Sequence, residues 1–132
     1  MATSSTVTAG TNATSAQYNN LRTDAIRRDA IIQFEVEDPL AVLNNQGGSF
    51  VAPFAYTVYQ VKIWCEVGTC TVRLKTGSTN ILASQAVTTT VTDVTVGFTT
   101  TAIALNDILT MDILSTSSGD HVIAQIFATR NI

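Results

Sequence analysis

Few side chains in this chain are of the kinds that catalyse reactions, and their spacing does not suit catalysis. The sequence has one histidine, His121, and two cysteines, Cys65 and Cys70. A histidine general base needs a nucleophile and an orienting acid within hydrogen-bond reach, and on a strand the neighbouring Asp120 would point to the opposite face. Two cysteines and one histidine also fall short of the four ligands of a structural zinc site. We therefore predict no catalytic site, no metal site and no cofactor.

Both cysteines fall within the stretch from Tyr56 to Lys75, whose alternation of apolar and polar residues predicts a β-hairpin. Residues 66–69 contain one glycine and would form its loop. The apolar face is expected to carry Tyr59, Val61, Ile63 and Cys65 from the first arm and Cys70, Val72 and Leu74 from the second. In this register Cys65 lies opposite Cys70, and the pair is either a disulfide or two buried thiols.

Two further positions are candidates for an interaction surface. The alternation places Trp64 on the outer face of the predicted hairpin, where it could serve as a ligand platform or an interface anchor. Alternatively, the loop over residues 39–53 or an N-terminal helix covers it. The last predicted strand, residues 121–129, is apolar on both faces, and its second face carries Ile123 and Phe127. Such a strand is either central in a sheet or part of a subunit interface.

Composition sets the fold class. The chain has 132 residues, of which only 13% are charged and 45% are hydrophobic, and threonine is abundant. This composition favours a single all-β domain. About eight antiparallel strands, separated by turns such as residues 115–120, predict a jelly-roll-like β-sandwich. The net charge of −3 does not favour nucleic-acid binding, and no apolar run reaches the roughly 20 residues of a membrane span.

The N-terminal region differs from the rest, so we divide the chain into residues 1–30 and a sandwich domain over residues 31–132. The first 13 residues predict an extended arm. Residues 15–28 predict the one short α-helix, with an apolar stripe of Tyr18, Leu21 and Ala25. A helix of this length is marginal alone. It must pack on its own sandwich, on its copies in an oligomer or on another protein.

Two motifs resemble proteins of tailed bacteriophages. Thr6 to Ile26 reads TVTAGTNATSAQYNNLRTDAI, and it resembles the N-terminal segment of many phage virion proteins, in which a Thr-Ala-Gly-Thr arm leads into a helix. Cys65 to Val72 reads CEVGTCTV, and it is similar to a hairpin of small β-sandwich domains in tail-fibre and head-decoration proteins. The resemblance implies a structural virion protein, often a homotrimer, that is anchored by its N-terminal arm.

The resemblance also implies a location and contact residues. The expected anchoring contacts are Tyr18, Asn19, Leu21, Arg22 and Ile26. Because the chain has no long repetitive shaft, a decoration or cement protein on the outer head surface is expected, made in the host cytoplasm and bound to the major capsid protein or another virion protein. The alternative is a tail-associated module that binds host-surface carbohydrate through the face of Trp64, Ile123 and Phe127 or through the loop over residues 39–53.

Overall fold

The computed structural model describes residues 29–37 and 42–131, and this part of the chain is all β-structure. It contains seven strands and no helix. Accordingly, no helix in these ranges is long and apolar enough to cross a membrane. The strands are β1 (Asp29–Val36), β2 (Leu43–Val51), β3 (Tyr56–Thr76), β4 (Thr79–Val87), β5 (Thr92–Val94), β6 (Ala102–Ile103) and β7 (Ile108–Arg130).

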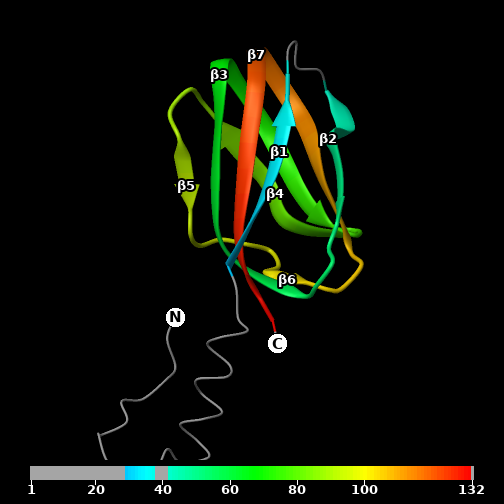
Figure 1. The fold of residues 1–132 in the computed structure, drawn as a ribbon. Helices are drawn as coiled ribbons and strands as arrows, with labels where there is room; N and C mark the ends of the chain where they lie inside the picture. Colours follow the sequence, from blue (N-terminus) through cyan, green and yellow to red (C-terminus); the bar gives the residue numbers. More distant parts are fainter. Residues whose placement is uncertain (1–28, 38–41, 132) are drawn as a thin grey trace, which may run out of the picture.

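Two long strands organise the sheet. β3 and β7 pair with each other in antiparallel fashion over nearly their whole lengths, and the other strands add to their edges in the order β1-β7-β3-β4. β2 also pairs with β7, and β5 and β6 pair with β3. Both long strands bend sharply near their middles, so the sheet folds back on itself (Figure 1).

The bend divides the sheet into two halves. We call the part with β1, β5, β6 and residues 56–67 and 120–130 of the long strands the β1 half. The part with β2, β4 and residues 69–76 and 108–117 is the β2 half.

The bend depends on a few residues with unusual backbone geometry. Val67 pairs with Asp120 and Thr69 with Ser117, so the single residue Gly68 on β3 faces two residues on β7. Such a β-bulge bends the strands and increases their twist. Gly68 has a φ of 68°, and Ser118 and His121 on β7 also have positive φ values. A glycine adopts this conformation at no steric cost, which explains its place at the bend.

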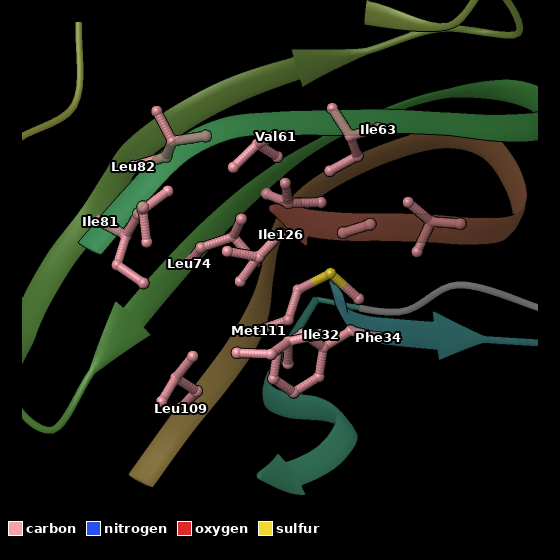
Figure 2. Packing of buried hydrophobic residues seen from close by; sticks show 14 of the residues in the cluster. Ile32, Phe34, Val61, Ile63, Leu74, Ile81, Leu82, Leu109, Met111 and Ile126 are labelled. Atoms are coloured by element: carbon pink, nitrogen blue, oxygen red, sulfur yellow. The ribbon is translucent and has the colours of Figure 1, made fainter. Parts of the chain in front are cut away.

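The core lies between the two halves. Alternate residues of each strand point inward, and 23 hydrophobic side chains are buried there in one cluster. Figure 2 shows Val61, Ile63 and Ile126 from the β1 half in the same cluster as Leu74, Leu109 and Met111 from the β2 half. Folding the sheet therefore buries the apolar face of each half against that of the other.

The predicted hairpin over residues 56–75 is wrong. Both of its arms belong to the single strand β3, and their partner is β7. The turn predicted at residues 115–120 is likewise part of β7. The glycine and serine signals were real, since Gly68 and Ser118 have positive φ, but they bend two paired strands instead of reversing one. These mergers reduce the expected eight or so strands to seven in the described ranges.

Two further sequence predictions meet different outcomes. The long loop expected over residues 39–53 is largely strand β2, whose pairing with β7 shifts register twice. Its two glycines and two asparagines are weak strand formers, which is why periodicity did not indicate a strand. The extended arm and the helix over residues 15–28 lie outside the described residues, as do Tyr18, Asn19, Leu21, Arg22 and Ile26.

Candidate functional site

The three residues predicted to share an interaction face lie together on the outer side of the β1 half. Trp64 on β3 is the register partner of Ile123 on β7, and Gln60 on β3 is the partner of Phe127. Ile123 and Phe127 are four residues apart on one strand, so they project from the same face. Each of the three side chains is partly exposed. We call the surface formed by the outward residues of β1, β3 and β7 in this half the outer face.

Three more side chains extend the outer face around Phe127. The register of β3 shifts between Val58 and Gln60, and this bulge leaves Tyr59 exposed instead of buried as alternation predicted. The rings of Tyr59 and Phe127 lie 6.4 Å apart, and the Lys62 ammonium lies 5.9 Å from the Phe127 ring. Ile31 on β1, 61% exposed, is the register partner of Phe127 on the other side. Around Phe127 the surface is thus aromatic and apolar with one cation.

Amide side chains lie between these apolar groups. Gln125 donates a hydrogen bond of 3.0 Å from its Nε2 to Oε1 of Gln33 across β7 and β1. Gln60 donates one of 2.7 Å to the carboxylate of Asp93 on β5. Planar amides held beside aromatic rings offer both donors and acceptors to a polar ligand.

A cluster of three titratable side chains, His121, Glu35 and Glu66, lies at the end of the outer face next to the bend. Nε2 of His121 lies 2.5 Å from a carboxylate oxygen of Glu35 on β1, and Nδ1 lies 3.0 Å from one of Glu66 on β3. Carboxylate oxygens only accept hydrogen bonds, so both contacts are satisfied together only when the imidazole carries a proton on each nitrogen. The hydrogen bonds to Glu35 and then to Glu66 raise the pKa of His121 above its ordinary value. When both nitrogens carry a proton, the ring links three adjacent strands.

This cluster was not foreseen from sequence, where His121 had no partner. The partners Glu35 and Glu66 come from other strands, and Glu35 lies 86 positions away in the sequence. Only the register of β1 and β3 on β7 brings them together. The two carboxylates bind opposite nitrogens of one ring. In the described ranges, no group of three or more His, Cys, Asp or Glu side chains is arranged to hold a metal ion.

The two cysteines lie at the bend, beneath the outer face. Both are buried free thiols, so the disulfide alternative is not formed in this structure. Sγ of Cys65 donates to the carbonyl oxygen of Gly68 at 3.2 Å. Burial raises the pKa of Cys65, and burial together with the neighbouring Cys65 thiol raises the pKa of Cys70 to about 11. Thiols with raised pKa values are poor nucleophiles, which argues for a packing role.

The outer side of the β2 half carries an ion-pair network that sequence analysis did not single out. The Asp112 carboxylate is buried, and one of its oxygens accepts hydrogen bonds from Nε of Arg73 at 2.9 Å and from an Arg73 terminal nitrogen at 2.7 Å. The Lys75 ammonium lies 3.2 Å from the same oxygen. Alternation of charged residues on the two strands was visible in the sequence, but their pairing across β3 and β7 was not.

Comparisons with protein-family models, with curated proteins and with solved structures found no match. The site therefore rests on its own geometry. That geometry offers an open, partly aromatic sheet face with the cluster of His121, Glu35 and Glu66 at one end, which suits binding.

Proposed function

We propose that this chain is a structural protein of a tailed-bacteriophage virion and not an enzyme. Its role would be that of a homotrimeric decoration protein that binds the outer head surface through its N-terminal region and stabilises the shell. The folded sheet would then be a jelly-roll-like β-sandwich displayed on the head. The two sequence motifs that resemble phage virion proteins support this assignment.

The structural observation that carries the proposal is the outer face. Trp64 pairs with Ile123 across the two central strands, and Phe127 lies four residues further along β7 on the same side. A sheet surface of this kind provides contact area to a neighbour, and aromatic residues are enriched in such contacts. A decoration protein makes the same contact at many equivalent sites, so modest single contacts add up across a shell.

Co-sedimentation of the full chain with undecorated heads, and separately with isolated tails, tests this proposal. Saturable binding to heads alone is expected. Because Arg22 is one of the proposed anchoring residues and Trp64 lies on the proposed contact surface, Arg22→Glu and Trp64→Ala should each weaken binding to heads. Absence of head binding by the wild-type chain would overturn the assignment.

A second candidate is a tail-associated module that binds host-surface carbohydrate. Alternation in the sequence placed Tyr59 on the inner face, which left few exposed aromatic residues for such a site. The outer face supplies the missing partners, because Tyr59 and Phe127 lie on the same side and amides lie between them. Aromatic rings with nearby amides are suited to the apolar and hydroxyl surfaces of a sugar.

A glycan array and a host-cell binding assay separate the two candidates. If the second is correct, the wild-type chain binds glycans and tails, and both Trp64→Ala and Tyr59→Ala abolish glycan binding. Val91→Ala, which alters an exposed residue in the loop between β4 and β5, serves as the matched control. No glycan binding by the wild-type chain would remove this candidate.

A further inference from the structure

The end of the sheet opposite the bend exposes four apolar side chains. Val51, Phe54, Leu105 and Ile108 are 57%, 41%, 57% and 49% exposed. Val51 and Ile108 are register partners on β2 and β7. We call these four residues the end patch.

Backbone hydrogen bonds bring the segments of the end patch together. The Ala52 amide donates to the carbonyl of Asp107, and the Asn106 amide donates to the carbonyl of Ala52, both at 2.8 Å. These bonds fix residues 51–54 against residues 105–108 at one end of the molecule (Figure 1). Exposed apolar groups gathered at one place mark an interaction surface more often than single exposed ones do.

Both ends of the described chain also lie here. Asp29, the first residue of β1, pairs with Thr129 near the end of β7. The Arg130 guanidinium lies 3.6 Å from the Phe54 ring centroid, and the Asn131 amide donates to the carbonyl of Ala55. The 28 residues that precede β1 are therefore tethered to the sheet beside the end patch.

The sequence of that segment contains apolar residues that could cover the exposed side chains of the end patch. Residues 15–28 lie outside the described part of the chain. As a helix they would carry Tyr18, Leu21 and Ala25 on one stripe and would extend about 21 Å, enough to lie across the end of a folded sheet.

We propose that residues 15–28 of the same chain pack on the end patch through the stripe of Tyr18, Leu21 and Ala25. Tethering at residue 29 gives the segment a high effective concentration at this surface. It also supplies the tertiary contact without which so short an amphipathic helix is marginal. Tyr18 and Leu21 would then serve packing within the chain and not the head contact. Asn19, Arg22 and Ile26 would lie on the adjacent helix face and remain available for the head contact, a last step that rests on the proposed function.

Hydrogen–deuterium exchange of the full chain, read by mass spectrometry, tests the packing without any virion partner. Amides of residues 18–28 should exchange at least about tenfold more slowly than in an unstructured peptide. Leu105→Asp, which changes an exposed residue between β6 and β7, should return them to unstructured rates. Val91→Asp, the same kind of apolar-to-acidic change at an exposed position in the loop between β4 and β5, should leave the protection unchanged. Slow exchange of the β3 and β7 amides in both variants shows that they fold.

Three outcomes would overturn the proposal. Unstructured exchange rates in the wild-type segment would mean that it packs only on an external partner. Protection that falls on dilution, with a dimer in sedimentation velocity, would identify a second copy as the occupant. Protection that survives Leu105→Asp would place the segment elsewhere on the sheet. None of these results depends on head binding, and loss of head binding in Arg22→Glu with segment protection unchanged would separate the two proposals.

Discussion

The two halves of the folded sheet share their long strands but differ on their outer sides. On the β2 half, the Asp112 carboxylate is buried and bound by Arg73 and Lys75, so the charges are satisfied within the sheet. On the β1 half, Trp64 and Phe127 stay partly exposed. The comparison indicates that one outer side is closed by its own ion pairs and the other is left open for contact.

The bend between the halves should be the most sensitive point of the molecule. A Cβ atom built on Gly68 would lie 2.6 Å from the carbonyl oxygen of Ser117 and closer still to that of Ser118. Backbone strain at positive φ costs about 1–2 kcal/mol, and overpacking adds about 1–3 kcal/mol. We therefore expect Gly68→Ala to lower the free energy of unfolding by about 3 kcal/mol or more, measured by urea denaturation.

Gly77→Ala is the matched control for this change. Gly77 also has positive φ, at 59°, but nothing lies within 4 Å of its added Cβ. Only the strain cost of about 1–2 kcal/mol should remain. Equal losses for the two variants would show that close approach of β3 and β7 does not determine the bend.

Removing the charge of Asp112 should have the next largest effect. Asp112→Asn keeps the shape of the side chain but leaves Arg73 and Lys75 without their buried anion. Breaking a buried ion pair is strongly destabilising, although here both cations can still reach water, so we expect a loss of about 2 kcal/mol in the free energy of unfolding. Asp93→Asn, at an exposed carboxylate bonded to Gln60, should change it by less than about 0.5 kcal/mol. Similar small losses for both would contradict the view that the β2 half is closed by this network.

The histidine cluster on the β1 half should make stability depend on pH. Folding raises the pKa of His121, so its contribution is fully present below the ordinary value of 6.5 and is lost as pH rises through the raised folded value. The thermal midpoint of the wild type should therefore fall over that window relative to His121→Asn. Asparagine tolerates the φ of 48° at this position but does not titrate there.

A nuclear magnetic resonance titration of the His121 ring checks the cause directly. Glu35→Gln should move its pKa back toward 6.5 by more than Glu66→Gln does, because the bond to Glu35 contributes most to the shift. Glu37 and Asp120, the acidic residues nearest to Glu35 and His121 in the sequence, are unchanged in both variants. An unshifted His121 pKa in the wild type would show that the three strands are not linked in this way.

These features show which parts of the molecule local sequence could predict. Alternation correctly placed Ile63 and Cys65 inward and Trp64 outward, because the period of two is a property of each strand alone. The all-β class followed from composition for the same reason. Glycine and serine at residues 68 and 118 correctly marked places of unusual backbone. Whether such a place reverses a strand or bends it depends on the strand with which it pairs. Here Gly68 on β3 lies opposite Ser118 on β7, about 50 residues further along the chain, so the two paired strands bend together.

The same limit applies to the candidate site. The sequence grouped Trp64, Ile123 and Phe127 from their alternation, and the structure places them on one face. The sequence could not predict that Tyr59 joins this face, since the bulge that exposes its ring arises from the register of β3 on β7. Nor could it pair His121 with Glu35, because that contact depends on β1 adding to the edge of β7 in one specific register.

Truncating Trp64 should have only a small effect on stability, because this side chain is partly exposed on the outer face. An open outer face predicts that Trp64→Ala costs about 1 kcal/mol or less, whereas Ile63→Ala, one position away and fully buried, costs about 2–5 kcal/mol. If the two losses were equal, something would cover Trp64 in the free protein and the outer face would be core. A small loss for Trp64 together with loss of binding to heads, tails or glycans would identify the partner of this face, because the side chain would then matter only when that partner is present.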